Sequence, residues 1–139
     1  MTTRAHTFAY DLPAEFGHVD ITGDLHAFVR DAGISDGILS LSVVGSTGGV
    51  TTIEYEPGAL QDLHRAFAEL VPADAHYEHN ARWGDGNGFS HVRSALLGTG
   101  STFPVIGGEL ALGTWQQVVV LNFDNRSRRR EVVAVLMGG

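Results

Sequence analysis

Hydrophobic residues form short alternating runs near the start of the chain and longer apolar runs further on. Residues 4–10 alternate loosely and predict a first strand, and a second short strand is expected to end at Asp20. Residues 37–44 are apolar enough for a central strand, which the glycine-rich segment 45–49 then breaks. Residues 50–55 predict the strand that follows this break.

Two segments show the three- and four-residue spacing of an amphipathic helix. The first begins after Asp20 or Thr22, either of which can cap it, and ends at Gly33, a favoured left-handed stop. The second opens at Glu56-Pro57, with proline at its favoured first position, and ends before Pro72. Their apolar stripes are Leu25, Phe28 and Val29 in the first, and Leu60, Leu63, Phe67 and Leu70 in the second.

The last third of the chain is predicted to be mostly strand. It follows a short helix over 91–97, capped by Ser90 and stopped by Gly98. Residues 102–106 and 109–112 flank Gly107-Gly108, a two-residue turn suited to a tight hairpin. A strand over 115–123, a turn over 124–127 and a strand over 128–137 follow. This order of elements predicts an α+β fold, and 139 residues without a linker predict a single domain over 1–139.

Composition excludes several classes of chemistry. The chain has no cysteine, which excludes thiolate nucleophiles, disulfides and thiolate metal ligands. All nine basic residues are arginine, and without lysine there is no Schiff base and no lysine general base. A net charge of -7 disfavours nucleic acid and anionic membranes as partners. No run approaches the roughly 20 apolar residues of a membrane helix, and no signal peptide is evident, so a cytoplasmic location is expected.

The segment 77–91 holds the strongest candidate site. His79 and His91 bracket a glycine-rich loop that carries Asp85. Two histidines and one carboxylate, from Asp85 or Glu54, would supply the three protein ligands of a catalytic zinc site. Alternatively, the two histidines only hydrogen-bond the loop into shape, and Glu54 is an ordinary exposed carboxylate at a strand end.

The loop 84–88 is also a candidate anion site, because it leads into a predicted helix start. Free amides there attract phosphate, so Asn87, Gly88 and Ser90 are candidate substrate-binding residues, and Arg93 would add charge. The same composition is equally typical of a plain turn. Gln116 is a further candidate hydrogen-bond donor to the substrate, whereas the neighbouring Trp115 is expected to pack against a core or a subunit interface.

Four arginines crowd the turn and strand near residue 128. A solvated strand edge is the usual role of such a charge run, because charge guards an edge against pairing. Phosphate recognition across a subunit boundary is the alternative, since arginine can fork two hydrogen bonds to one phosphate. These arginines are Arg126, Arg128, Arg129 and Arg130. The remaining histidines are scattered and form no evident cluster: His6, His18, His26, His64 and His76.

A set of residues spread over nearly the whole chain resembles one known family. They are Glu54, Glu56-Pro57, Tyr77, His79, Asp85-Gly-Asn-Gly88, His91, Arg93, Leu96-Leu-Gly98, Pro104-Val105 and Leu110-Ala-Leu-Gly-Thr-Trp-Gln116. Together they resemble the YjbQ-like family, often described as secondary thiamine-phosphate synthase enzymes. The Leu-Gly-Thr-Trp-Gln run with its upstream Pro-Val is the most specific part of this likeness.

The resemblance implies a two-sheet β-sandwich with two main helices, assembled as a homotrimer with polar sites near the subunit boundaries. It also implies a weak thiamine-phosphate synthase activity, which joins a pyrimidine diphosphate to a thiazole phosphate. A departing diphosphate needs a cation or a metal on its oxygens. The expected ligands are therefore a phosphorylated small molecule and a divalent ion, zinc or magnesium, with His79 and His91 as the metal ligands.

The sequence departs from the family pattern at three positions. Gly45 and Phe89 stand where members usually have histidine, and Ile53 stands where asparagine is usual. Two functions remain open. One is a trimeric binding or scaffold protein that kept the fold and lost the chemistry. The other is an enzyme acting on phosphorylated small molecules, with catalytic roles for Glu54, Asp85 and Arg93.

Overall fold

The computed structural model describes residues 1–139 and contains eight strands and four helices. The strands are β1 (Thr2–Leu12), β2 (Gly17–Asp20), β3 (Gly37–Val44), β4 (Gly48–Ile53), β5 (Gly100–Ile106), β6 (Glu109–Leu110), β7 (Gln117–Asn122) and β8 (Arg128–Gly138). The helices are α1 (Thr22–Ala32), α2 (Pro57–Leu70), α3 (Glu78–Trp83) and α4 (Gly88–Leu97). The predicted α+β class is confirmed, with the two main helices joined by two shorter ones, α3 and α4.

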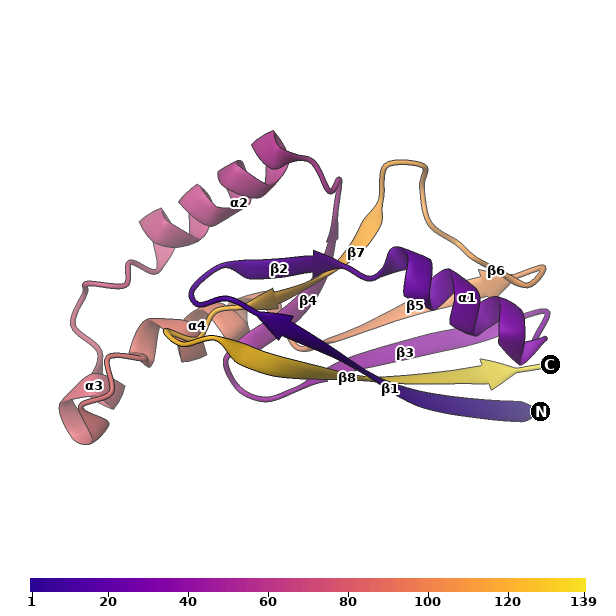
Figure 1. The fold of residues 1–139 in the computed structure, drawn as a ribbon, viewed down its shortest axis with the longest axis horizontal. Helices are drawn as coiled ribbons and strands as arrows, with labels where there is room; N and C mark the ends of the chain where they lie inside the picture. The colour runs from indigo at the N-terminus through magenta and orange to yellow at the C-terminus, as the bar shows by residue number, and fades with distance from the viewer.

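The strands form two antiparallel sheets. One has five strands in the order β1-β8-β3-β5-β6, and the other has three in the order β2-β7-β4. The last strand in sequence, β8, therefore lies between β1 and β3, and its register pairs Gly138 with Thr2. The two ends of the chain meet at one end of the molecule, while α2, α3 and α4 lie towards the other end (Figure 1).

The main core lies between the two sheets and α1. Strand β3 alternates as the pleat requires, with Leu39, Leu41 and Val43 buried and the residues between them exposed. These side chains join a cluster of 17 buried residues that also takes Leu25 from α1 and Val120 from β7. The predicted apolar stripe of the first helix thus packs against both sheets.

A smaller core supports the α2 and α4 end of the molecule. Phe67 of α2 packs against Val119, Leu121 and Phe123 from the segment that contains β7. The ring centres of Phe67 and Phe123 are 5.0 Å apart. Strand β7 is buried on both faces because the main core covers one side and this cluster covers the other.

Local chemistry fixes the predicted helix ends. Oδ1 of Asp20 accepts from the backbone N–H of Thr22 at 2.9 Å, and Gly33 ends α1 with a φ of 65°. Glu56 caps α2 through its carboxylate, which accepts from the N–H of Ala59 at 2.8 Å, and Pro57 follows at the first helical position. Helix α2 begins as predicted, whereas α1 begins at Thr22 with Ile21 at its N-cap, so that neither Asp20 nor Thr22 is the capping residue.

Several boundaries differ from the predictions. Helix α3 was not predicted, and α4 begins at Gly88, so that Ser90 lies inside it instead of capping it. Strand β4 begins at Gly48, and β7 begins at Gln117 instead of residue 115. Trp115 precedes β7 with 71% of its surface exposed, which corrects the expectation that it packs in this chain's core. None of the helices has the length and hydropathy needed to cross a membrane.

Candidate functional site

A buried arginine anchors a polar network at one end of the sheets. Arg130, on β8, keeps only 5% of its surface exposed. Its Nε and Nη2 donate to Oδ1 of Asn122 at 3.1 and 2.6 Å, and Nη2 also donates to Oγ1 of Thr47 at 2.5 Å. Asn122 comes from β7 and Thr47 from the turn between β3 and β4. The guanidinium therefore joins the two sheets.

Asp124 is the acidic centre of the network and is 1% exposed. Its Oδ2 accepts from Oγ1 of Thr47 at 3.0 Å and from Nδ2 of Asn87 at 3.2 Å, and Nε of Arg128 lies 3.1 Å from it. Burial raises the pKa of the Asp124 carboxyl, but these hydrogen bonds and one from the N–H of Arg126 outweigh burial and hold that pKa below its usual value. Asp124 is therefore ionised at neutral pH.

Side chains organise the start of α4. Oδ1 of Asn87 accepts from Oγ of Ser90 and, at 3.1 Å, from the N–H of Asn125. Ser90 is fully buried. The N–H of Gly88 donates to Oδ1 of Asn80 at 2.8 Å. Of the three residues predicted here to bind substrate, Asn87 lines a pocket, whereas Ser90 and the Gly88 amide are used within the protein.

His79 and Asp85 form a hydrogen-bonded pair between α3 and α4. Nε2 of His79 lies 2.9 Å from Oδ2 of Asp85, and Oδ1 of Asp85 accepts from the N–H of Asn87 at 3.1 Å. The hydrogen bond from His79 is the largest cause of a lowered pKa of Asp85, and desolvation opposes it. The ring centres of His79 and His91 are 4.5 Å apart. The structure thus brings together both predicted histidines and Asp85.

A polar pocket of about 450 Å³ lies beside this pair. Its lining contains no hydrophobic side chain and consists of Asp85, Asn87, Asn125, Arg126 and Arg128. Guanidinium and amide N–H groups are the donors that suit phosphate oxygens. The pocket therefore combines two cationic side chains with the carboxylate of the His79–Asp85 pair.

Arg93 does not line this pocket. It is 2% exposed, and its Nε and Nη2 donate to the carbonyl oxygen of Val71 at 3.0 and 2.9 Å. Its Cζ lies 4.8 Å from the centre of the Phe89 ring. This geometry corrects the expectation that Arg93 adds charge to an anion site, because the guanidinium instead ties α4 to the end of α2.

Glu54 and Gln116 lie at a distance from the pocket. Glu54 is exposed just after β4, and Nε2 of Gln116 donates to Oγ1 of Thr52 at 3.2 Å. The pairing of β4 with β7 places this end of the sheet five residues from Asn122, a separation of about 17 Å. A single chain therefore does not bring Glu54 or Gln116 to the pocket.

The arginine cluster is divided between different environments. Arg126 and Arg128 line the pocket, and Arg130 is buried. Arg129 is exposed, with Nη1 3.7 Å from Oδ1 of Asp11. The prediction of a solvated strand edge is wrong, because β8 lies inside the five-stranded sheet and its alternation turns Arg130 inward.

Sequence analysis missed the buried polar residues that support the pocket. Thr47 lies in what was predicted only as a break, and Asp124 and Asn125 lie in what was predicted only as a turn. Asn122 could have indicated this buried polar network. It directly follows the apolar residues 118–121 of β7, and a buried amide requires hydrogen-bond partners.

Comparison with known proteins places the chain in a family. A model of the family described as UPF0047 protein YjbQ-like matches residues 6–139. The chain belongs to the YjbQ/UPF0047 family. A UPF0047 protein of Methanothermobacter thermautotrophicus is 38% identical over 117 residues, covering 84% of this chain and 80% of the relative. UPF0047 protein YugU of Bacillus subtilis is 33% identical over 122 residues, covering 86% of this chain and 89% of the relative.

Solved structures support the same assignment to the YjbQ/UPF0047 family. A hypothetical protein from Aeropyrum pernix K1 superposes with a TM-score of 0.90 at 27% identity, covering 98% of this chain and 99% of that one. A YbjQ-like protein from Sulfolobus solfataricus P2, described as of unknown function, superposes with a TM-score of 0.88 at 26% identity. That match covers 99% of this chain and 100% of the other.

Gly45 and Phe89, the two positions at which the family resemblance implies histidine, have different surroundings. Phe89 is 2% exposed and lies under Arg93, so its ring belongs to the protein interior. Gly45 has a φ of 141°, and a Cβ there would lie 2.9 Å from Nη1 of Arg130. A side chain at position 45 would therefore contact the buried network that supports the pocket.

The residues as placed do not fit a metal centre. No three or more His, Asp or Glu side chains are grouped so that they could hold an ion. Nε2 of His79 is engaged by Asp85, and His91 lies beside His79, with an angle of 50° between the ring planes and without a third ligand in place. A divalent metal on His79 and His91 stays a prediction from the family resemblance.

Proposed function

We propose that this YjbQ-like protein binds a phosphorylated small molecule in the polar pocket beside the His79–Asp85 pair. The observation that carries the proposal is the meeting of two guanidinium and two amide side chains around one pocket without hydrophobic lining. The chain as a whole has a net charge of -7, so these arginines are a local concentration of positive charge. Arg126 and Arg128 can each fork two hydrogen bonds to phosphate oxygens.

The His79–Asp85 pair would supply the acid–base group of a reaction on that molecule. Asp85 accepts a hydrogen bond from Nε2 of His79, so Nδ1 is the nitrogen left to exchange a proton with a ligand. The finer proposal is a thiamine-phosphate synthase-type transfer. The thiazole nitrogen would attack the methylene carbon of the pyrimidine diphosphate, and the bond from that carbon to the diphosphate oxygen would break. Nδ1 of His79 would donate a proton to the departing diphosphate, and Arg126 and Arg128 would stabilise its charge.

Binding of inorganic pyrophosphate, measured by isothermal titration calorimetry, tests the pocket. We expect Arg126→Ser to weaken binding about tenfold, because one charge-assisted contact is lost. The Arg126→Ser/Arg128→Ser double variant should abolish detectable binding. Arg65→Ser is the matched control, since Arg65 is an exposed arginine on α2 that pairs only with Asp62. Equal affinity in all four proteins would refute the proposed site.

A transferase assay distinguishes an enzyme from a binding or scaffold protein without activity. The protein would be incubated with the pyrimidine diphosphate and the thiazole phosphate, and thiamine phosphate would be measured by chromatography. We expect slow turnover that His79→Ala abolishes. Pyrophosphate binding without turnover would support the second candidate, a catalytically degenerate binding or scaffold protein. The observation that favours this candidate is the burial of Phe89 and the lack of a side chain at Gly45.

We also propose that the protein is a homotrimer. The outer face of the five-stranded sheet carries large hydrophobic side chains that nothing in the chain covers: Ile38, Val44, Ile106 and Met137. Exposed apolar patches of this kind mark protein–protein interfaces. A neighbouring chain would also be needed to bring a Glu54 or a Gln116 to the pocket.

Light scattering after size-exclusion chromatography tests the trimer. We expect a mass about three times the 14.9 kDa of one chain. Ile38→Glu should yield monomers, because it places a charge on the proposed interface. Leu70→Glu is the matched control, since Leu70 is 77% exposed on α2, away from this sheet. A wild-type mass of one chain would exclude the trimer.

A further inference from the structure

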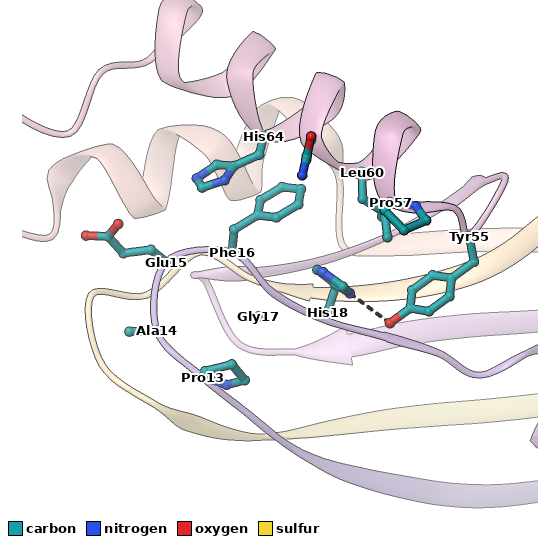
Figure 2. A pocket seen from close by; sticks show the side chains of 11 residues that line it. Pro13, Ala14, Glu15, Phe16, Gly17, His18, Tyr55, Pro57, Leu60 and His64 are labelled. Carbon is teal, nitrogen blue, oxygen red and sulfur yellow. Dashed lines mark hydrogen bonds between the residues drawn. The ribbon is translucent and has the colours of Figure 1, made fainter.

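A second cleft, larger than the polar pocket, lies between α2 and the turn that joins β1 to β2. Its volume is about 650 Å³, within the range of roughly 300–1000 Å³ usual for small-molecule sites. Figure 2 shows Phe16, His64, His18 and Tyr55 along it, with Glu15 at one end and Tyr55 at the other. None of the lining residues is needed by the proposed phosphate chemistry.

Aromatic and imidazole rings give this cleft flat walls. The rings of Phe16 and His64 are stacked, with centres 4.4 Å apart and an angle of 6° between their planes. Nδ1 of His18 lies 2.8 Å from the hydroxyl oxygen of Tyr55, and the two rings meet edge to face (Figure 2). Such walls favour a planar ligand, because stacking adds to the area buried.

The charge of the cleft selects the kind of ligand. No arginine lines it, and Glu15 is its one carboxylate. Burial, and secondly the nearby His64, lowers the pKa of His18. Burial, and secondly Asp20, raises the pKa of Tyr55, so both groups are neutral at pH 7. Negative charge beside ring faces attracts an organic cation and repels an anion.

Backbone strain at Glu15 is a second, independent observation. Glu15 has a φ of 68° and is the one non-glycine residue of the chain with a positive φ. A conformation of this kind costs about 1 kcal/mol or more and tends to occur at ligand sites. The N–H of Glu15 donates to the carbonyl oxygen of Asp124 at 2.7 Å, which holds the turn in place. The strained turn therefore fixes the backbone of Glu15 and Phe16 at one end of the cleft.

We propose that this cleft binds a small planar organic cation, with its flat body against the aromatic wall and its cationic group directed to Glu15. Arg93 is the nearby cation that acts on Glu15, but it is covered and its Nε and Nη2 are used by Val71. The proposal does not rest on the phosphate site, since the two pockets share no lining residue.

Three small molecules that have nearly the same shape and different charges test the proposed cation site. Benzamidine is a planar cation, benzamide is its neutral counterpart and benzoate is the anion. Each would be titrated into 15N-labelled protein and followed by amide chemical shifts. We expect benzamidine to bind more tightly than benzamide and benzoate not to bind. The perturbed amides should lie in residues 13–18 and 55–64.

Two substitutions test separately the charge of Glu15 and the stacking surface of His64. Glu15→Gln should weaken benzamidine about 3- to 10-fold and remove its advantage over benzamide. His64→Ala should weaken benzamidine and benzamide alike, about 3- to 10-fold, because a stacking surface is lost. Glu109→Gln is the control, since Glu109 is an exposed carboxylate on β6. The Arg126→Ser/Arg128→Ser variant should bind benzamidine normally, which separates this proposal from the phosphate site.

Three results would overturn the proposal. One is equal binding of the three probes, which would remove the role of charge. Another is a set of perturbed amides outside the cleft. The third is unchanged benzamidine binding by Glu15→Gln in a protein whose thermal unfolding matches the wild type.

Discussion

Arg129 and Arg130 are adjacent in sequence and lie on opposite faces of β8. The Arg129 side chain is 65% exposed, beside Asp11, whose side chain is 81% exposed, whereas Arg130 is buried against Asn122 and Thr47. A matched pair of substitutions therefore compares the contribution of a buried arginine to the free energy of unfolding with that of an exposed one. Arg130→Met should lower the free energy of unfolding by about 3 to 5 kcal/mol, because it leaves Oδ1 of Asn122 without its guanidinium donors and removes a buried positive charge near Asp124.

Arg129→Met should change the same free energy by no more than about 0.5 kcal/mol. Urea denaturation followed by circular dichroism measures both values. Equal effects of the two substitutions would mean that the network around Arg130 does not contribute to stability.

Arg93 is predicted to act on stability and not on ligand binding. Arg93→Met should destabilise the protein by about 1 to 3 kcal/mol, since the carbonyl of Val71 loses its buried donors. Pyrophosphate affinity should be unchanged at a temperature where the variant is folded. A variant of wild-type stability with lost pyrophosphate binding would restore the role expected from sequence.

Acid should weaken the His79–Asp85 pair. The pKa of Asp85 is lowered in the folded protein, so its contribution to stability is present above the unfolded-state pKa and is lost as pH falls through the folded-state pKa. We expect a small difference in melting temperature between wild type and Asp85→Asn near pH 7 that shrinks as pH falls below about 4. Thermal unfolding across this range measures it. A difference that grows towards acid would contradict the assignment.

Metal content tests the remaining prediction from the family resemblance. Because Asp85 engages His79 and no third ligand joins the two histidines, we expect wild-type protein dialysed in zinc-free buffer to retain well below one zinc per chain. Mass spectrometry with an inductively coupled plasma gives the ratio. Near one metal per chain, lost in His79→Ala/His91→Ala and kept in His26→Ala, would instead establish a metal site that forms by rearrangement.

Elements with local signals were predictable from the sequence. Glu56-Pro57 and Gly33 mark helix ends, and Gly107-Gly108, with φ values of 59° and 79°, marks the hairpin. Helix α3 was missed because its six residues carry no apolar stripe and none of them is buried. Gly84, which ends α3 with a φ of 65°, was the available indicator.

Only the part of the candidate site that lies in one continuous segment was predictable from the sequence. His79, Asp85 and His91 belong to one continuous segment, so sequence alone groups them. Arg126 and Arg128 reach Asp85 only because β7 ends and β8 begins beside the start of α4. The burial of Arg130 depends on the register of β8 with β3, which no local pattern specifies.

The order of the strands also bears on how the protein is made. Strand β7 is the middle strand of the three-stranded sheet, and β8 lies between β1 and β3 in the five-stranded sheet; both lie within residues 117–138. During synthesis β1, β2, β3 and β4 are therefore made before β7 and β8, and their edges and core side chains stay exposed until these partners are available. Both sheets can therefore be completed only after residues 117–138 have been synthesised, and their assembly is dominated by long-range pairing, which makes folding slow. Chaperone demand should be highest for chains stalled between α4 and β7.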